Sequence, residues 1–309
     1  MCAATCDTFC GNTTNYSNLN FSDGMAGLVR IAYEEYTNLF DKRSDPRVED
    51  WPLMDSPWPT LVMVGSYLYL VMFLGPKIME NRKPFKLNNV LVVYNAMQTL
   101  FSLIMFSEHL MSGWLLDYSY ACQPVDYSTN PTALRMANLC WWYYLSKLTE
   151  FCDTIFFVMR KKDNQITLLH LYHHSLTPIE TWVCVKFLAG GHGTFSNLVN
   201  NFVHIIMYTY YMISAMGPQY QKYLWWKQHL TTLQLAQFTV VFFHSAQVLF
   251  FDCGYPKTIA LFLLVHSTIF FFLFFDFYKK AYEREEERKK KMQKALEDQL
   301  NGNDIKKIE

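Results

Sequence analysis

The amino-acid sequence predicts an all-α polytopic membrane protein. Hydrophobic residues make up 51% of the 309 residues, and only 17% are charged, a composition typical of membrane proteins. Apolar segments long enough to cross about 30 Å of hydrocarbon occur seven times, near 58–76, 90–112, 136–159, 166–188, 195–216, 230–251 and 258–278. We therefore expect seven transmembrane helices in one membrane domain, 58–278, between an amino-terminal segment, 1–57, and a tail, 279–309.

The amino-terminal segment carries three glycosylation sequons, which begin at Asn12, Asn15 and Asn20. Its first 25 residues lack the basic start and apolar core of a cleavable signal peptide. The sequons predict that this segment lies on the extracytoplasmic side.

The distribution of Lys and Arg predicts the same orientation. Basic residues follow the first, third, fifth and seventh spans, whereas 113–134 and 189–194 contain none and 252–257 contains only Lys257. Because basic loops stay in the cytosol, the amino terminus is predicted to be lumenal and the carboxyl terminus cytosolic.

Two of the eight cysteines lie in loops assigned to the oxidising lumen, Cys122 and Cys253. A disulfide between them would join spans two and three to spans six and seven. Two free thiols are the alternative, and Cys2, Cys6 and Cys10 are competing partners.

Span three carries Lys147, Glu150, Asp153 and Thr154 within about a third of the helix circumference. Facing lipid, its three charges would cost roughly 8 to 10 kcal/mol. Buried against other spans, Lys147 and Glu150 can pair while Asp153 orients an imidazole. The alternative is an ion pair with a purely structural role.

Span four contains three histidines in five residues: His170, His173 and His174. Positions i, i+3 and i+4 share one face of a helix, so the rings converge. Ionisable groups at this depth usually mark function, here metal binding or acid, base or nucleophile chemistry.

Spans five and six add further polar side chains. Span five carries Asn200, His204, Met207, Tyr208 and Tyr211 along one stripe, and span six adds Thr231, Gln234 and Gln237, for which interhelical hydrogen bonding is the alternative. The remaining histidines are left unassigned as core residues: His109, His192, His229, His244 and His266.

The tail is a charged helix end that leaves the membrane. Lys306 and Lys307 stand where a carboxyl-terminal dilysine signal returns membrane proteins to the endoplasmic reticulum. With a net charge of zero and no nucleotide-binding loop, no nucleic-acid partner is expected.

Four ordered blocks resemble a known family. They are Lys147-x-x-Glu150-x-x-Asp153-Thr154, His170-x-x-His173-His174, Asn200-x-x-x-His204-x-x-Met207-Tyr208-x-Tyr210-Tyr211 and Thr231-x-x-Gln234-x-x-Gln237. In these blocks and their order the chain resembles the very-long-chain fatty acid elongases, membrane 3-oxoacyl-CoA synthases. The resemblance implies seven helices, six of them forming an inverted barrel around an acyl tunnel that opens to the cytosol.

The resemblance also implies a reaction in which an acyl-CoA and malonyl-CoA give a 3-oxoacyl-CoA two carbons longer, carbon dioxide and CoA. It places the nucleophile at His173 and its partner at His204, with His170 and His174 orienting rings and thioester. Glu150 and Asp153 would fix tautomers, and Asn200 or Tyr208 would donate to the enolate oxygen. No metal and no tightly bound cofactor is expected.

CoA phosphates call for a basic cytosolic site. The candidates are Lys147, Arg160, Lys162, Gln165, Lys227, Thr231, Gln234 and Lys280, although the cytosolic bias of Lys and Arg alone explains basic loops. Expected partners are the bilayer and the ketoreductase, dehydratase and enoyl reductase of the elongation cycle; a homodimer is a candidate assembly.

Three other functions remain as alternatives. A di-iron desaturase or hydroxylase shares the HxxHH block but needs about eight clustered histidines, and measured iron would decide. A receptor is suggested by the span count alone, and a transporter by charges within spans, without the broken-helix pair that transporters show. The acyl chain length is not determined; Lys186 and bulky residues of spans six and seven are candidates for the tunnel floor.

Overall fold

The computed structural model describes residues 30, 34, 36–37, 40 and 43–305, and these residues form helices and connecting turns without a strand. The chain divides into two compact units, Met1–Ser44 and Asp45–Glu309. In the first unit, an exposed ion pair joins Arg30 and Glu34 at 2.8 Å. The predicted sequons at Asn12, Asn15 and Asn20 and the dilysine pair Lys306 and Lys307 lie outside the described residues.

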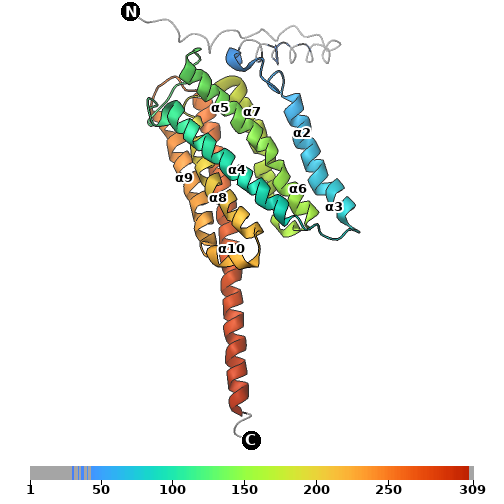
Figure 1. Cartoon of the computed structure of the whole chain (residues 1–309). Coiled ribbons are helices and arrows are strands. Elements are labelled where there is room, and N and C mark those ends of the chain that lie inside the picture. Colours follow the sequence, from blue (N-terminus) through green and yellow to red (C-terminus); the bar gives the residue numbers. More distant parts are fainter. Residues whose placement is uncertain (1–29, 31–33, 35, 38–39, 41–42, 306–309) are drawn as a thin grey trace, which may run out of the picture. The chain divides into compact units, whose positions relative to one another are not determined.

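The second unit contains helices at all seven predicted positions (Figure 1). Its helices are α2 (Trp58–Tyr69), which runs through a π-helical turn (Leu70–Leu74) into α3 (Gly75–Met79), α4 (Asn88–His109), which ends in a second such turn (Leu110–Trp114), α5 (Pro131–Thr149), α6 (Phe151–Met159), α7 (Leu168–Leu188), α8 (Thr194–Ala215), α9 (Lys227–Phe250) and α10 (Lys257–Ile305). Short 3-10 helices cover Pro46–Val48, Asp163–Gln165 and Pro218–Tyr223.

Four of these segments are long and apolar enough to cross a membrane by hydropathy: Trp58–Met79, Asn88–Trp114, Lys227–Phe250 and Lys257–Lys280. The chain is therefore a multi-pass membrane protein. The helices over the other three predicted spans carry the first three of the four polar blocks, which lower their hydropathy. They are not short: α7 has 21 residues and thus extends over about 31 Å.

The helices pack in pairs that bring distant parts of the sequence together. α4 packs along α8, α9 along α10, and α5 against α7. In Figure 1, α4 crosses in front of α8, and the carboxyl-terminal half of α10 continues beyond the other helices of this unit. Large apolar side chains such as Val93, Met97 and Phe243 are exposed, as expected for surfaces that face lipid.

The third predicted span is divided in the structure. α5 ends at Thr149 and α6 begins at Phe151, so Glu150 stands at the junction. Two hydroxyls next to this junction donate hydrogen bonds to backbone carbonyls of α5: Ser146 donates to the carbonyl of Tyr143, and Thr149 to that of Ser146. The break therefore lies at one of the charged residues of the span.

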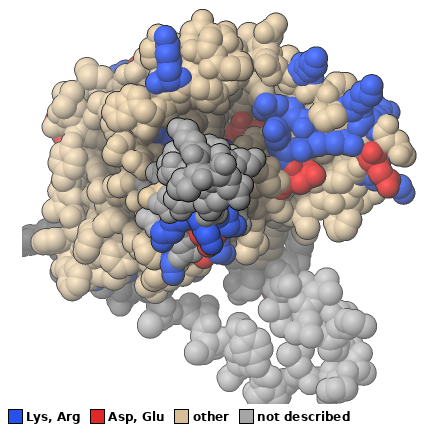
Figure 2. Space-filling model, turned by 90° about the horizontal axis from the view of Figure 1, so that it is seen from below, with Lys and Arg blue, Asp and Glu red and all other residues tan. Residues whose placement is uncertain are grey.

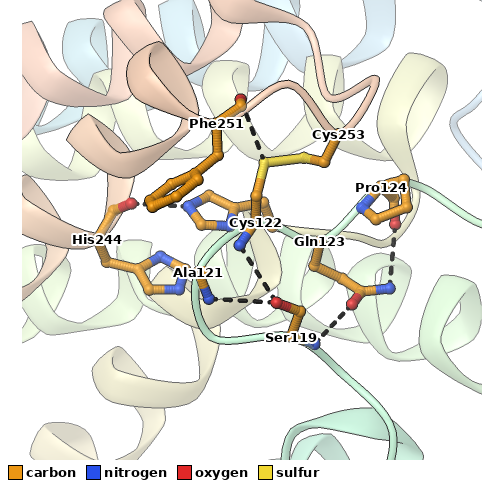
Figure 3. Close-up of a disulfide and its surroundings, with 9 residues drawn as sticks. Ser119, Ala121, Cys122, Gln123, Pro124, His244, Phe251 and Cys253 are labelled. Atoms are coloured by element: carbon orange, nitrogen blue, oxygen red, sulfur yellow. Dashed lines mark hydrogen bonds between the residues drawn. A yellow bond between two sulfur atoms is a disulfide. The ribbon is translucent and has the colours of Figure 1, made fainter.

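One end of the bundle is closed by a disulfide. Cys122, between α4 and α5, is bonded to Cys253, between α9 and α10, so the predicted disulfide is present (Figure 3). Beside it the rings of His192 and His244 stack with centroids 3.8 Å apart. The same end of α7 is covered by residues 45–54: Asp45 donates its backbone N–H to the carbonyl of Lys186 at 2.8 Å.

Arg47 holds this end together without a covalent bond. Its guanidinium pairs with Asp45 at 2.6 Å, and both side chains are buried. It also donates to the backbone carbonyls of Asp126 and Ala189. Removal of one member of such a buried pair leaves an uncompensated charge. Residues 45–57, which precede the first span, belong to the same compact unit as the membrane helices.

Candidate active site

A buried ion pair lies at the carboxyl-terminal end of α5 and is hydrogen-bonded to α8. Lys147 Nζ lies 2.7 Å from Glu150 Oε1, and the two side chains are 2% and 3% exposed. The same ammonium donates to Asn200 Oδ1 at 3.0 Å, and Tyr143 donates to that oxygen at 2.8 Å. The pair is thus part of a hydrogen-bonded network, which removes most of the cost of burying its charges.

This network defines how His204 is oriented. Because Asn200 Oδ1 accepts two hydrogen bonds, the Asn200 amide nitrogen faces His204 Nε2, 3.3 Å away. An amide nitrogen only donates, so Nε2 is the acceptor and the ring proton is on Nδ1. His204 Nδ1 lies 3.5 Å from Glu150 Oε1, which places a carboxylate on the protonated side of the ring.

The three histidines of α7 cluster as their spacing predicts. The ring centroids of His170 and His174 are 4.3 Å apart, and those of His173 and His174 are 5.0 Å apart. His170 Nε2 lies 2.7 Å from the Thr154 hydroxyl, which in turn contacts the Tyr67 hydroxyl at 2.8 Å. The His170 ring is therefore linked to α2 by hydrogen bonds through the Thr154 and Tyr67 hydroxyls.

Asp153 lies beside a tyrosine. Its Oδ2 accepts a hydrogen bond from Tyr208 at 3.0 Å, and it is Glu150 that lies close to an imidazole. The predicted roles of Asp153 in fixing a tautomer and of Tyr208 in binding an enolate stay predictions. The contact links span three to span five.

His173 lines an internal cavity that runs away from the ion pair toward the disulfide end. Its walls come from α5, α7, α8, α9 and α10, and its volume is about 100 Å³. Tyr143, His173 and Asn200 lie at one end, and Gly190, Gly193 and Tyr255 at the other. Lys186, a predicted floor residue, is buried but is not among the described residues that line this cavity.

Part of the same cluster has the composition of a metal site. Glu150, His173 and His174 each offer a ligand atom, and these atoms lie within 4.8 Å of one another. Carboxylate and imidazole ligands suit several divalent metals, so this geometry alone does not distinguish a metal centre from a set of reactive side chains.

Residues 52–291 match the model of the ELO, GNS1/SUR4, family. The chain belongs to the ELO family. It is 54% identical over 247 residues to a very long chain fatty acid elongase of Aedes aegypti, covering 80% of this chain and 69% of that protein. It is 52% identical to very long chain fatty acid elongase 7 of Drosophila melanogaster, over 79% of this chain and 75% of the relative, and 50% identical to the Rattus norvegicus elongase 7, over 82% and 89%.

Membership of the ELO family favours fatty acid elongation over the di-iron alternative, because the matched relatives are named elongases. All four sequence blocks of this ELO chain lie within the matched range. The structure brings the first three of them to one end of the cavity.

The predicted CoA-binding residues of this ELO chain fall on several elements. Arg160 and Lys162 lie at the end of α6 beside the exposed Lys77, Lys83 and Lys86, where Phe85 donates its backbone N–H to the carbonyl of Met159. Figure 2 shows Lys and Arg side chains gathered on one part of this face, with acidic side chains between them. Gln165 is exposed in the short helix after α6.

The other predicted CoA-binding residues are placed differently. Lys227 begins α9, with Thr231 one turn later, and Gln234 donates to the sulfur of Met207 at 3.6 Å. Lys280 forms an exposed pair with Asp276 at 2.7 Å on α10. Lys147 is hydrogen-bonded within the buried network. It therefore lies near the histidines and is not part of the basic surface.

Sequence reasoning missed four residues near the histidines of this ELO chain. Tyr67 and Tyr143 complete hydrogen-bond chains from other helices, and a tyrosine in an apolar segment gives no signal of that role. Glu180 and His266 line the cavity. Glu180 follows His173 by seven residues, nearly two helical turns, a spacing that places both on one face.

Proposed function

We propose that this ELO family chain is the condensing enzyme of fatty acid elongation, a 3-oxoacyl-CoA synthase. The observation that carries the proposal is the position of His173: it stands between the Lys147–Glu150–Asn200–His204 network and a long internal cavity. The cavity suits an acyl chain, and the cluster suits the chemistry of its thioester.

The first half-reaction uses His173 as a nucleophile. A neutral imidazole nitrogen attacks the thioester carbonyl of the acyl-CoA, forming a C–N bond as the C–S bond breaks. CoA leaves as a thiolate and takes up the proton that the acylated ring loses. The acyl chain, now an acyl-imidazole, lies in the cavity.

The second half-reaction uses malonyl-CoA. Its carboxylate leaves as carbon dioxide, and the resulting enolate carbon attacks the acyl carbonyl. The new C–C bond forms as the C–N bond to His173 breaks, which releases the 3-oxoacyl-CoA, and the departing imidazolate takes up a proton from water to regenerate the imidazole. Donors aimed at the developing enolate charge stabilise this step, and the Asn200 amide, fixed by Lys147 and Tyr143, is placed to be one.

His204 acts as the partner of His173. The Glu150 carboxylate beside Nδ1 fixes the ring and its tautomer, and the Asn200 amide holds Nε2. His170, held by Thr154, and His174 position the reacting ring and thioester. No metal and no tightly bound cofactor takes part in this scheme.

The membrane arrangement follows from the same proposal. Seven helices span the bilayer, six of them forming an inverted barrel of which five line the cavity, with the disulfide end in the lumen of the endoplasmic reticulum and the basic end in the cytosol. CoA phosphates bind Arg160, Lys162 and Lys227, which are near or on that basic face. The ketoreductase, dehydratase and enoyl reductase of the cycle consume the product.

The test is an assay with labelled malonyl-CoA, unlabelled long-chain acyl-CoAs and microsomes that contain the full chain. We expect label in a 3-oxoacyl product two carbons longer than the acyl substrate. No incorporation above that of microsomes without the chain would refute the function. Metal analysis of the same purified protein gives a second check, since stoichiometric iron would favour oxidative chemistry at Glu150, His173 and His174.

A further inference from the structure

The cavity that His173 opens into is not lined by apolar side chains alone. Partway along it, Glu180 of α7 faces His266 of α10, and both line the cavity. Their side chains are 11% and 9% exposed, and Glu180 Oε2 lies 3.1 Å from His266 Nδ1. Proposed catalysis at His173 does not use this pair, because it lies deeper in the cavity.

The pair has unused hydrogen-bonding capacity. His266 Nδ1 is close to Glu180 but is not aligned for a hydrogen bond, and it has no hydrogen-bond partner among the described residues. Within the described part of the chain, no donor is hydrogen-bonded to the Glu180 carboxylate either. A buried carboxylate without hydrogen bonds is costly, so the site gains when a ligand supplies a donor.

A neighbouring amide adds to this polar zone. Gln237 of α9 is buried, lines the same cavity and makes no hydrogen bond to any described residue. The hydroxyls close by are different: Thr181 donates to the carbonyl of Thr177, and Ser267 to that of Leu264. The unused hydrogen-bonding capacity therefore belongs to the Glu180 carboxylate, the His266 imidazole and the Gln237 amide. Together these groups can both accept a hydrogen bond from one hydroxyl group and donate one to it.

An ordinary hydrocarbon chain cannot use these groups, whereas a hydroxylated chain can. We propose that the Glu180–His266 pair is a specificity site for an acyl chain that carries a hydroxyl group in its middle. The hydroxyl donates to the Glu180 carboxylate and accepts from His266 or Gln237. The inference rests on the proposed function, because it takes the acyl chain to extend from His173 into the cavity.

The depth of the pair sets the position of the hydroxyl. Glu180 follows His173 by seven residues on α7, which corresponds to roughly 10 Å along the helix axis. An extended chain with C–C bonds of about 1.5 Å advances roughly 1.3 Å per carbon, so the pair lies about eight carbons beyond the carbonyl. The site therefore selects a chain with its hydroxyl on about the ninth carbon.

The test compares positional isomers with the wild-type chain in microsomes. Stearoyl-CoA competes in turn with hydroxystearoyl-CoAs that carry the hydroxyl on the fourth, about the ninth or the last carbon, with labelled malonyl-CoA. Because leaving buried polar groups without a hydrogen-bond partner costs a factor of about ten or more, we expect the mid-chain isomer to be elongated at least tenfold faster than stearoyl-CoA. The other two isomers should show no such advantage.

Variants then assign the preference to the pair. Glu180→Leu is expected to reduce the ratio of mid-chain hydroxyl to plain product about tenfold or more, whereas Glu180→Gln, which keeps an acceptor, retains part of it. Glu108→Gln makes the same change at an exposed carboxylate paired with Arg135 and should leave the ratio as in the wild type.

Each result has a definite reading. Equal rates for all isomers, with stearoyl-CoA elongated, overturn the specificity site and leave the proposed function standing. An unchanged preference in a Glu180→Leu chain that elongates stearoyl-CoA overturns the assignment to Glu180. No malonyl incorporation with any chain overturns the proposed function and this inference with it. The wild-type comparison decides the first point even where a variant fails to fold.

Discussion

At the histidine end of the cavity, side chains from five helices hold one another by hydrogen bonds and one buried ion pair. The opposite end is held by a disulfide and by the hydrogen bonds of Arg47 to backbone carbonyls. Under the proposed function, the histidine end needs charged and nucleophilic side chains that exchange protons and share hydrogen-bond partners. Under the same proposal, the opposite end needs a rigid backbone, because it sets the depth of the acyl tunnel. The two ends meet these different needs with different bonds.

The largest effect is expected from breaking the network at the histidine end. Lys147→Met leaves Glu150 buried without its cation, which typically costs 3–5 kcal/mol. We expect a sharp loss of folded protein and of malonyl incorporation, measured by thermal unfolding in detergent and by the microsomal assay. Lys280→Met removes an ammonium from an exposed pair, for which about 0–1 kcal/mol is expected. Similar losses in both variants would show that burial of the network has no special importance.

The disulfide end should respond less, and in stability more than in chemistry. Cys122→Ser with Cys253→Ser opens a loop with a sequence separation of 131 residues, and loss of a disulfide costs about 2–4 kcal/mol. We expect the double variant to unfold at a lower temperature than the wild type, and reductant should not change that temperature. The wild type should become equally unstable only after its disulfide is reduced. A variant that unfolds like the oxidised wild type would mean that Arg47 and packing hold this end alone.

A smaller effect is expected where the cavity ends. A Cβ at Gly193 would lie 2.6 Å from the Tyr255 hydroxyl, so Gly193→Ala pushes this buried ring and narrows the cavity end. Overpacking of this kind costs about 1–3 kcal/mol, and the products should shorten by at least one two-carbon cycle. Gly65→Ala, where no atom lies within 4 Å of the new carbon, is the control. Products of unchanged length from Gly193→Ala would place the floor elsewhere.

The helices could be predicted from the sequence because seven long apolar segments leave few alternatives. The predicted span 195–216 corresponds to α8, Thr194–Ala215, and 166–188 to α7, Leu168–Leu188. The cluster of His170, His173 and His174 was also predictable, because helical periodicity alone brings these rings together. Local sequence thus determines both features.

Contacts between helices were harder to predict. The pairing of Glu180 with His266 joins α7 to α10, and neither residue lies in a motif; a lone histidine in an apolar span usually belongs to the core. No sequence pattern indicated that the span would break at Glu150 or that Arg47 would bind carbonyls of two other loops. These features depend on which helices become neighbours, and hydropathy carries no information on that.

The central claim is that His173 carries the acyl chain. The most direct measurement incubates the purified chain with a long-chain acyl-CoA in the absence of malonyl-CoA and locates the acyl group by mass spectrometry after digestion. We expect acylation of His173 in the wild type and in His229→Ala, a change at an exposed histidine outside the cluster. His173→Ala should show neither the acyl group nor malonyl incorporation. An acyl group on another residue, or full malonyl incorporation by His173→Ala, would contradict the account.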